Sequence, residues 1–467
     1  MAERCITIVG GGLAGAEAAW QAVRGVACVR LYEMRPTVRT PAHRTDRLAE
    51  LVCSNSLKSE SLEDASGLLK TEMRALDSMI LRCAEAHRVP AGSALAVDRE
   101  EFAAAVTHTI TSHPKIQVVR EEVQEVPASR PVIVASGPLT SDRLAADLAA
   151  RFAAWLESQA PSVESRAAPL EPRTAAPRTS NLLYFYDAIS PIVAADSINR
   201  DVAYAAARYG VGGADYLNCP LTRDEYQQFR EALLSGERYP LHDFEQPNYF
   251  EGCLPIEELA ERGEDTLRFG PMRPVGLRDP RTGKRPFAVV QLRQENRGPE
   301  GRPTMYNLVG FQTRLRRGDQ TKALRLIPGL ERAEILRYGS VHRNTFLTAP
   351  VLLQDTLEFR GAPGLFFAGQ LTGVEGYLES AATGLLAGIN AVRLAQGTPL
   401  VCPPRTTMLG ALLHYLTTAS PATFQPINAN FGLLPVLSQV VRDRQERNRL
   451  LVARAQADFQ VWRQHLE

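Results

Sequence analysis

The first thirty-three residues contain apolar and small-residue stretches in the order strand, helix, strand. The run at 6–9 (ITIV) is typical of a short buried strand, and the stretch at 27–32 predicts a second one. Between them, 14–23 is rich in alanine and has a helical pattern. Glycines join the first strand to the helix, and Glu33 follows the second strand. This order indicates a βαβ unit that binds a dinucleotide.

Each glycine of this fingerprint has a physical role. Gly10 allows a tight turn, Gly12 lets the backbone approach a pyrophosphate, and Gly15 lets the helix pack closely on the strand. The helix N-terminus offers N–H groups and a partial positive charge to the phosphates. The acidic side chain after the second strand can accept hydrogen bonds from a ribose 2′-OH. The expected cofactor contacts in this unit are Gly10, Gly11, Gly12, Leu13, Ala14, Gly15 and Glu33.

A second strand that ends in glycine lies near the other end of the chain. The apolar run at 364–369 is followed by a helical pattern over 377–395 with a small-residue face. Because ligands of open α/β sheets bind at the carboxyl ends of strands, we expect Gly369, Gln370 and Gly373 to contact the same cofactor. A cofactor contacted by both ends of the chain favours tightly held FAD. No second strand-preceded GxGxxG is present, so NAD(P)H would dock transiently as the reductant.

The composition changes twice in the middle of the chain. The stretch at about 159–180 is rich in Pro, Ala, Ser, Arg and Glu, which predicts a disordered or loosely packed insert. From 182 onward, short strands and turns predict a second domain. The expected fold is therefore α/β: a Rossmann-like FAD-binding domain (1–181 and 346–467) interrupted by a smaller α+β insertion domain (182–345). Further helices are predicted over 61–86, 98–111, 222–234 and from about 437, and further strands over 116–120 and 131–135.

The overall composition is that of a soluble globular protein. The chain has 467 residues, 45% of them hydrophobic and 22% charged, which suits two or three domains. No apolar run approaches the ~20 residues of a transmembrane helix, and no secretion signal is evident. The seven cysteines are scattered and lack CxxC pairs, which argues against a disulfide framework and against a zinc site. We therefore expect a cytoplasmic protein with no membrane attachment and no bound metal.

Charge is concentrated in one region although the net charge is only +1. Residues 262–325 contain fifteen Lys or Arg and six Asp or Glu, with aromatic residues interleaved. Such a run is either a solvated face or a cationic surface that follows phosphates, and charge alone slightly favours the solvated face.

The segment at 51–59 (LVCSNSLKS) places Cys53 before a predicted helix, with Lys58 nearby. A thiol near a helix N-terminus and a lysine has a lowered pKa and is reactive. A buried structural cysteine is an equally good interpretation of its position.

Several segments together resemble the bacterial folate- and FAD-dependent tRNA (uracil-5-)-methyltransferase family, and the resemblance covers nearly the whole chain. The matching segments are 51–59 (LVCSNSLKS), 217–220 (LNCP), 251–257 (EGCLPIE), 269–277 (FGPMRPVGL), 290–294 (VQLRQ), 309–313 (VGFQT), 342–346 (HRNTF) and 367–377 (FAGQLTGVEGY). The Pro/Ala-rich insert departs from the family pattern.

The resemblance implies that the protein methylates C5 of the T-loop uridine of tRNA. Methylenetetrahydrofolate would donate the carbon, and reduced FAD would serve as reductant and methylene carrier. Addition of a thiolate to C6 makes C5 nucleophilic, and a base must then remove the C5 proton. The family's two cysteines correspond to Cys53 and Cys219. Our hypothesis is that Cys219 attacks C6 and Cys53 is the base, although the two roles can be exchanged.

Two further sets of residues are candidates for substrate contacts. His342 and Arg343 are candidates for binding folate. The T-loop base must be flipped out of its stack, and RNA contacts to phosphate fit the basic stretch at 262–325. Arg314, Arg316 and Arg317 are the candidate tRNA contacts. No obligate protein partner is expected.

Other activities compete with this interpretation. A related flavoprotein helps to install carboxymethylaminomethyl groups on wobble uridines, but it is longer, has a larger C-terminal helical domain and works with a GTPase. This chain is short after residue 400 and carries the LNCP segment. A metabolic flavin oxidoreductase would need neither paired cysteines nor a basic insertion domain. A non-enzymatic flavin-binding scaffold explains the fewest of these features.

Overall fold

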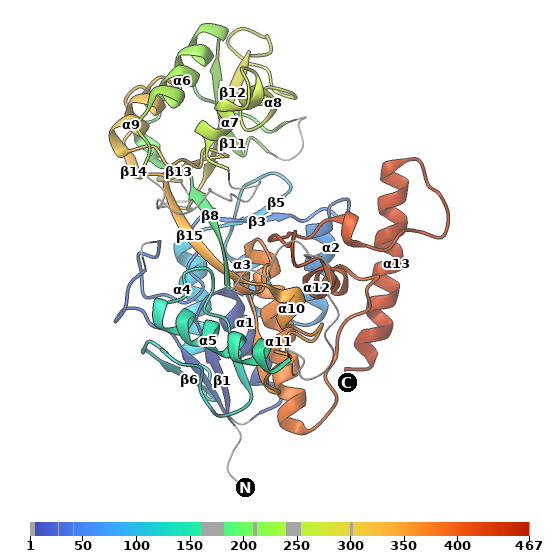
Figure 1. The fold of residues 1–467 in the computed structure, drawn as a ribbon. Coiled ribbons are helices and arrows are strands. Elements are labelled where there is room, and N and C mark those ends of the chain that lie inside the picture. The colour runs from blue at the N-terminus through green and yellow to red at the C-terminus, as the bar shows by residue number, and fades with distance from the viewer. Residues whose placement is uncertain are drawn as a thin grey trace, which may run out of the picture.

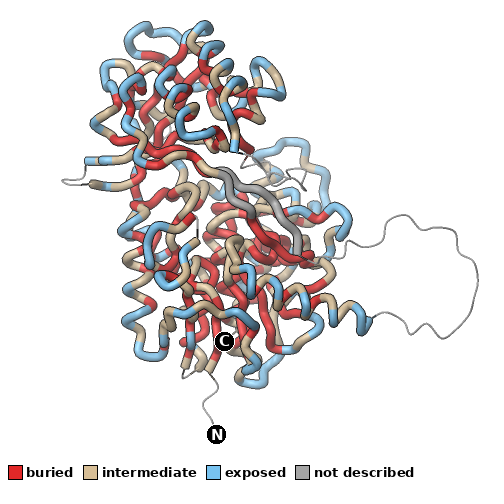
Figure 2. The backbone as a smooth tube through the Cα atoms, turned by 60° about the vertical axis from the view of Figure 1, so that its left-hand side comes forward, coloured by how far each residue is buried: buried red, intermediate tan, exposed pale blue. Residues whose placement is uncertain are grey.

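The computed structural model describes residues 5–26, 28–40, 42–159, 182–208, 213–239, 254–298 and 302–466, without the side chains of 182–188 and 341–343. The predicted Pro/Ala-rich insert, apart from its first residue, lies outside these ranges. The described chain packs around two separate large hydrophobic cores, one in a larger and one in a smaller unit (Figure 1). Buried residues run through the interior of both units (Figure 2).

A parallel five-stranded sheet forms the centre of the larger unit. Its order is β16 (Leu365–Phe367), β7 (Val132–Val134), β1 (Ile6–Val9), β2 (Val29–Tyr32) and β6 (Ile116–Val119). All neighbouring pairs are parallel, and β1 and β7 are buried along their full length. Continuous apolar runs suit strands that are covered on both faces. The predicted α/β Rossmann-type fold class is therefore confirmed.

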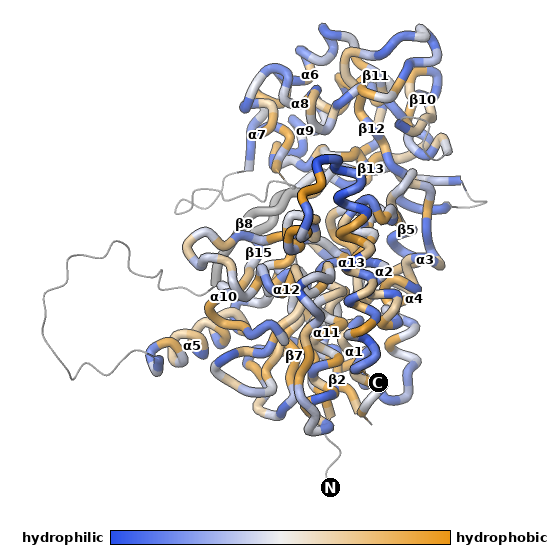
Figure 3. The backbone as a smooth tube through the Cα atoms, turned by 90° about the vertical axis from the view of Figure 1, so that its right-hand side faces the viewer, coloured by the Kyte–Doolittle hydropathy of each residue, from blue (hydrophilic) through white to orange (hydrophobic). Residues whose placement is uncertain are grey.

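Two helices from opposite ends of the chain pack closely against each other beside this sheet. They are α1 (Leu13–Ala22) and α11 (Tyr377–Gln396), and Figure 3 shows apolar residues along both. A Cβ atom on Gly384 would collide with the carbonyl of Ala14, so the small-residue face of α11 is what lets the helices approach. The first and last parts of the chain therefore meet at one sheet.

Further elements surround the larger core. The helices are α2 (Ala65–Ala75), α3 (Met79–Ala86), α4 (Arg99–Thr111), α5 (Asp142–Gln159), α10 (Ala349–Leu352), α12 (Met408–Thr418) and α13 (Arg444–Gln464), with 3₁₀ turns η5 (Gln370–Thr372) and η6 (Phe431–Leu433). A small sheet has the order β3 (Ser56–Ser59), β5 (Ala94–Val97) and β4 (Arg88–Val89).

Two helix predictions in this unit were wrong at their boundaries. The single helix predicted over 61–86 is in fact α2 and α3, because Asp77 has a φ of 59° and the Ser78 side chain caps α3 by accepting a hydrogen bond from the Leu81 N–H. The C-terminal helix begins later than predicted, where the Asp443 side chain accepts a hydrogen bond from the Glu446 N–H at 2.7 Å. In both places a side-chain cap sets the helix start.

The smaller unit is built on an antiparallel sheet. Its order is β10 (Tyr204–Ala205), β11 (Tyr216–Leu221), β12 (Ala288–Gln294), β13 (Met305–Leu308), β9 (Ile192–Ala194) and β14 (Ile335–Arg337). The helical elements are η1 (Ala195–Ser197), α6 (Arg223–Ser235), α7 (Ile256–Glu261), α8 (Thr266–Phe269) and α9 (Arg317–Arg325). The start of α6 is fixed by a capping box between Thr222 and Glu225, and Phe229 of this helix is fully buried in the core.

An antiparallel ribbon of β8 (Leu182–Ile189) and β15 (Ser340–Leu347) joins the two units (Figure 1). Leu182 pairs with Leu347 at the end of the ribbon that enters the larger unit. The proposed division into 1–181, 182–345 and 346–467 places both boundaries near that end, where the chain leaves and re-enters the larger unit.

One pair of cysteines contradicts the expectation that no disulfides form. Cys5 and Cys28 are joined by a disulfide, with their Cα atoms 4.6 Å apart. They immediately precede β1 and β2, whose register pairs Ile6 with Val29. Parallel neighbouring strands thus bring together two cysteines 23 positions apart, which their sequence spacing does not reveal. The cysteine pattern therefore gives no argument for the expected cytoplasmic location.

The described residues contain neither a helix suited to crossing a membrane nor a group of side chains suited to holding a metal ion. None of the helices there combines the length and the apolar character that crossing a membrane requires. Within the same ranges, no three His, Cys, Asp or Glu side chains are grouped so that they could hold a metal ion.

Candidate active site

A deep cleft lies at the carboxyl ends of the parallel strands of the larger unit. Its empty volume is about 1040 Å³, open solvent at the mouth included. Of the predicted cofactor residues, those that line it are Gly10, Gly11, Gly12, Leu13, Ala14, Glu33, Gly369 and Gln370. Val52 and Tyr377 also line it. The structure therefore brings both ends of the chain to one site, as the strand–glycine pattern predicts.

Two predicted cofactor residues lie behind the cleft wall. A Cβ atom on Gly15 would collide with the carbonyl of Gly10, so this glycine provides the close helix–strand contact expected of it. Gly373 ends the 3₁₀ turn η5 with a φ of 91°, and a Cβ there would overlap the ring of Phe424. Neither residue is among those that line the cleft.

The first turn of α1 is shaped for an anion. Gly10 has a φ of 105°, and a Cβ there would collide with the carbonyl of Ala135 in the next strand loop. Gly12, the residue that precedes the helix, provides no side-chain cap, so N–H groups of the first turn stay available. A helix N-terminus with a close backbone approach is the usual seat of a pyrophosphate.

Glu33 is held in the orientation that the fingerprint requires. Its Oε2 accepts a hydrogen bond from the Gly11 N–H at 3.1 Å, and its Oε1 accepts one from Arg35 Nε at 2.9 Å. Burial would raise the pKa of Glu33, but the hydrogen bonds and charge of Arg35 lower it below its ordinary value. The carboxylate is therefore ionised at neutral pH. It also accepts hydrogen bonds from the Arg35 N–H at 3.0 Å and from Arg35 Nη2 at 3.1 Å, so its four lone pairs all have donors and a ribose hydroxyl would have to replace one of them.

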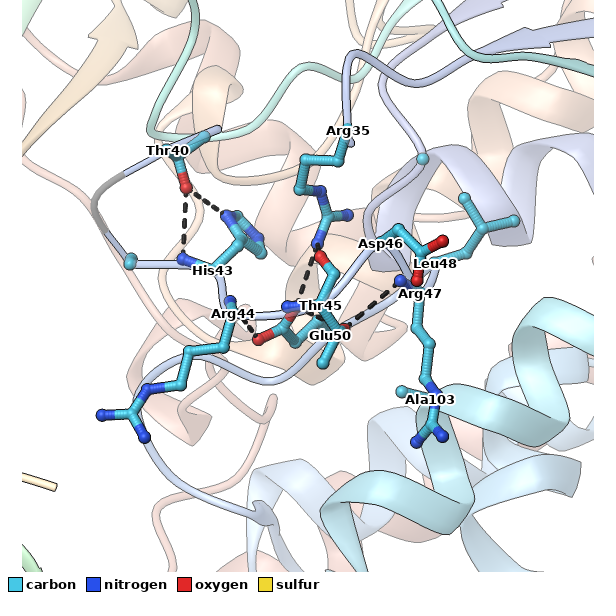
Figure 4. A network of polar contacts seen from close by, with 12 residues as sticks. Arg35, Thr40, His43, Arg44, Thr45, Asp46, Arg47, Leu48, Glu50 and Ala103 are labelled. Carbon is cyan, nitrogen blue, oxygen red and sulfur yellow. Dashed lines mark hydrogen bonds and ion pairs between the residues drawn. The ribbon is translucent and has the colours of Figure 1, made fainter. Parts of the chain in front are cut away.

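A polar network, which the sequence did not reveal, fixes the loop that borders the cleft (Figure 4). Arg35 Nη1 donates to Glu50 Oε2 at 3.1 Å, and Glu50 also accepts hydrogen bonds from the backbone of Arg44 and Thr45. His43 lies beside these groups, and burial lowers its pKa to about 4. This ring is therefore neutral at pH 7.

Cys53 is next to residues of the same cleft, although it is not itself among those that line it. It follows Val52 and is half-buried, and its N–H donates to the Tyr377 hydroxyl at 2.7 Å. The strand β3 and a turn separate Cys53 from the first helix after it, α2, which begins at Ala65, so the thiol does not lie at a helix N-terminus. Lys58 does not act on the thiol as expected, since its Nζ binds Glu379 Oε1 at 2.6 Å.

Cys219 lies in a different environment. It belongs to β11, pairs with Val290 and has no solvent exposure, as part of the smaller unit's core. Burial raises the pKa of its thiol to about 12. In this arrangement the structure brings Cys53 to the cleft but leaves Cys219 enclosed.

The candidates for folate and tRNA contacts lie on the connecting ribbon and on the smaller unit. His342 and Arg343 lie on β15, paired with Asp187 and Tyr186, but their side chains lie outside the described part of the structure. Arg314 is mostly buried and forms an ion pair with Glu258 at 2.7 Å.

The other two arginines of this group have more exposed positions. Arg316 is 56% exposed with a 3.3 Å pair to Glu237, and Arg317 is exposed, with its guanidinium over the ring of Tyr338. Arg316 and Arg317 are therefore better placed than Arg314 to meet a phosphate.

Arg99 is a site residue that sequence reasoning missed. Its Nη1 donates to the carbonyl of Leu51 and its Nη2 to the carbonyl of Cys53, on both sides of Val52. Its Nη2 also pairs with Glu295 Oε2 of the smaller unit at 2.8 Å. Residues 99 and 295 are too far apart in sequence for any local pattern to connect them.

Comparisons with known proteins agree with this picture. The family model described as "Glucose inhibited division protein A" matches residues 5–399. A protein of Pelotomaculum thermopropionicum named Methylenetetrahydrofolate--tRNA-(uracil-5-)-methyltransferase TrmFO is 54% identical over 455 residues, which cover 97% of each chain. The protein of the same name from Bacillus subtilis is 51% identical over 455 residues, 97% of this chain and 98% of its own.

A solved structure supports the fold. Aquifex aeolicus GidA in its form I crystal has a TM-score of 0.65 and 17% sequence identity, and the match covers 98% of this chain and 76% of that one. At that identity the likeness shows the fold alone. Since relatives above 50% identity extend over nearly the whole chain, the protein belongs to the methylenetetrahydrofolate--tRNA-(uracil-5-)-methyltransferase family, and the resemblance drawn from its motifs is confirmed.

Proposed function

We propose that this protein methylates C5 of the T-loop uridine of tRNA, with methylenetetrahydrofolate as carbon donor, FAD in the cleft and NAD(P)H as reductant. The observation that carries the proposal is a thiol residue, Cys53, beside the cleft that the dinucleotide-fingerprint residues line, in a chain of this family. We place this activity in the cytoplasm, without an obligate protein partner.

The residues of the cleft fit FAD. The first turn of α1 offers uncapped N–H groups to the pyrophosphate. Ionised Glu33 lines the cleft and could accept a ribose hydroxyl in place of one of its present donors. Gly369 and Gln370 close the cleft from the far end of the chain, with Tyr377 beside them. Bound FAD would supply the hydride equivalent that brings the transferred carbon to the methyl level.

Cys53 is the sulfur that the geometry favours for chemistry at the cleft. A uracil becomes nucleophilic at C5 when a thiolate adds to C6, and the C5 proton must later be removed. Cys53 is our candidate for either step, because Val52, which precedes it, and Tyr377, which accepts its N–H, both line the cleft. Cys219 can join the reaction only after β11 opens, because its sulfur is fully enclosed. We keep the roles proposed from the sequence: Cys219 attacks C6 and Cys53 is the base, and the two roles can be exchanged.

The basic stretch at 262–325 is the proposed contact with tRNA. It lies largely on the smaller unit, which carries nine more Lys and Arg than Asp and Glu over these residues. Several of these cations are paired, as Arg314 is with Glu258, so only part of the charge is available. Contacts of this kind depend on phosphates and make binding salt-dependent.

The double substitution Arg316→Glu with Arg317→Glu is expected to weaken tRNA binding without loss of FAD. Each lost phosphate contact should reduce the slope of log affinity against log salt by about one. Filter binding at several salt concentrations measures this slope. Arg449→Glu, on α13 of the larger unit, is the matched control, since Arg449 is exposed and pairs only with Glu446 three residues earlier. Unchanged affinity in the double variant would place the RNA surface elsewhere.

The proposed activity is tested by incubating the purified protein with an unmodified tRNA transcript, methylenetetrahydrofolate and NADPH or NADH. We expect a yellow protein whose flavin spectrum bleaches with the nicotinamide and recovers when folate and tRNA are added. 5-Methyluridine should then be found in the T-loop. A modification at the wobble uridine alone would favour the related wobble-modifying activity, and oxidation of a small molecule alone would favour a metabolic oxidoreductase.

A further inference from the structure

The sheet of the smaller unit has one face in that unit's core and the other face toward the larger unit. Leu292 of β12 and Leu308 of β13 lie in the core, so Arg293 and Asn307, the next residue pair along the two strands, point to the opposite face. The Cβ atoms of such register partners are about 4.5–5.5 Å apart. We call Arg293 and Asn307 the Arg–Asn pair.

The row of residues that contains the Arg–Asn pair touches the larger unit on both flanks. On β11, Tyr216 is the register partner of the arginine, and its hydroxyl donates to the carbonyl of Ala91 at 3.1 Å. On β14, two strands beyond the asparagine, Arg337 Nη2 contacts the carbonyl of Ala42 at 3.5 Å. The Arg–Asn pair therefore lies between two contacts that join the units.

The side chains of the Arg–Asn pair have no hydrogen-bond or ion-pair partner in the described part of the chain. Arg293 is only 8% exposed and Asn307 only 2%, and Arg293 Nε and Asn307 Nδ2 are enclosed. The Nη groups of Arg293 are not enclosed in this way, so they remain accessible to a ligand. Because an uncompensated buried charge is costly, this place favours an anion.

Three charged side chains near the Arg–Asn pair have partners of their own. Glu295, two residues beyond the arginine, gives Oε2 to Arg99 at 2.8 Å. Asp215, next to the tyrosine of the same row, accepts a backbone N–H of the larger unit at 2.7 Å. Arg208 donates to a glutamine of β12 at 2.9 Å. Neither of these carboxylates is therefore paired with Arg293.

The end of β12 lies against the segment that carries Cys53. The carbonyl of Gln294, directly after the arginine of the pair, accepts a hydrogen bond from Asn55 Nδ2 at 3.0 Å. Asn55 is two residues after Cys53, and Val52, directly before Cys53, lines the cleft. The Arg–Asn pair is therefore on the side of the smaller unit that faces the proposed reaction site.

We propose that Arg293, with Asn307 beside it, binds a carboxylate of the glutamate group of the folate donor between the two units. The inference rests on the proposed function, which supplies this ligand. A planar guanidinium matches a carboxylate with two parallel N–H···O bonds, and the Asn307 amide is a neighbouring donor without an acceptor. A tRNA phosphate is the other anion of the reaction, but side chains that are at most 8% exposed suit a small ligand better than an RNA backbone.

The test measures binding of tetrahydrofolate to the full chain with FAD bound, by anaerobic isothermal titration calorimetry without tRNA. Arg293→Gln should weaken this binding at least about tenfold, because a charge-assisted hydrogen bond is lost. Arg293→Lys should restore part of the affinity. 6-Methyltetrahydropterin has the pterin ring but no glutamate, so its binding should be the same in wild type and Arg293→Gln. Arg332→Gln, at an exposed arginine of the same unit, is the matched control and should bind both ligands as wild type does.

Thermal denaturation separates a ligand-binding role from a structural one. Since Arg293 is buried and unpaired, Arg293→Gln should not lower the melting temperature of the folate-free protein. Tetrahydrofolate should raise the melting temperature less in this variant than in wild type. Asn307→Asp gives the arginine a carboxylate inside the protein, so it should also weaken tetrahydrofolate binding while the folate-free protein stays at least as stable as wild type.

Equal affinity for tetrahydrofolate in wild type and in folded Arg293→Gln would overturn the inference. An equal loss of affinity for 6-methyltetrahydropterin would overturn it as well, since that ligand has no carboxylate. Weaker tRNA binding of Arg293→Gln on filters, with unchanged folate binding, would assign the pair to a phosphate instead. Each of these results leaves the proposed methylation standing, whereas a wild-type protein that binds no tetrahydrofolate would refute both the proposed function and the inference.

Discussion

Replacing Cys53 with alanine is expected to abolish tRNA methylation while FAD stays bound. Removal of a group that forms or breaks a bond to the reacting base typically lowers the rate by at least about a thousandfold. Cys53 is half-buried and belongs to neither hydrophobic core, and its hydrogen bond to Tyr377 comes from the backbone N–H, so the fold should be unaffected. Single-turnover methylation of a tRNA transcript, together with the flavin absorbance of the purified variant, measures both quantities.

Cys402→Ala provides the matched control for this variant. Cys402 is also partly buried and outside the disulfide, but burial raises the pKa of its thiol to about 12 and it does not line the cleft. Its replacement should leave methylation within about twofold of wild type, as expected for a residue without a catalytic role. Full activity in Cys53→Ala would remove Cys53 from the mechanism.

Cys219→Ala addresses the enclosed thiol separately, and we expect it to abolish methylation as well. Loss of activity with an unchanged melting temperature would show that this sulfur reaches the base after β11 rearranges. Retained activity would contradict its assignment and leave Cys53 as the thiol that acts at the cleft.

The second large effect is expected at Gly15. A Cβ atom there would collide with the Gly10 carbonyl, and backbone on both sides is fixed by β1 and α1. Overpacking of this kind typically costs about 1–3 kcal/mol. Gly15→Ala should therefore lower the melting temperature of the protein even without cofactor, and displace the turn that binds the pyrophosphate. Thermal denaturation of the apoprotein and flavin titration measure the two effects.

Gly12→Ala distinguishes a ligand contact from a packing contact. A Cβ atom on Gly12 meets nothing within 4 Å in the protein, so apoprotein stability should be unchanged. If the backbone at this position approaches a pyrophosphate, the same methyl group should weaken FAD binding. A variant that binds FAD as well as wild type would show that the cofactor does not approach Gly12.

The sequence was sufficient for features that depend on neighbouring residues. Gly10, Gly12 and Gly15 follow one another in a fixed pattern, and Glu33 follows the next strand, so local spacing defines the part of the cleft formed by β1, α1 and β2. The strand before Gly369 could be assigned to the same cleft, because Gly369, like Gly10, follows the carboxyl end of a parallel strand.

Features that depend on long-range contacts could not be predicted in this way. The disulfide of Cys5 and Cys28 arises from the register of β1 and β2. The enclosure of Cys219 follows from which face of β11 meets the smaller core. The break between α2 and α3 depends on the positive φ of Asp77, a single backbone angle that the helical pattern does not reveal.

The most direct test of the account follows the carbon itself. The protein is incubated with a tRNA transcript and methylenetetrahydrofolate labelled in its methylene carbon, and the T-loop nucleoside is analysed by mass spectrometry. We predict that the labelled carbon appears on C5 of the T-loop uridine in the wild-type protein and is absent in Cys53→Ala. An unlabelled methyl group on that uridine, or no methyl group there, would contradict the account.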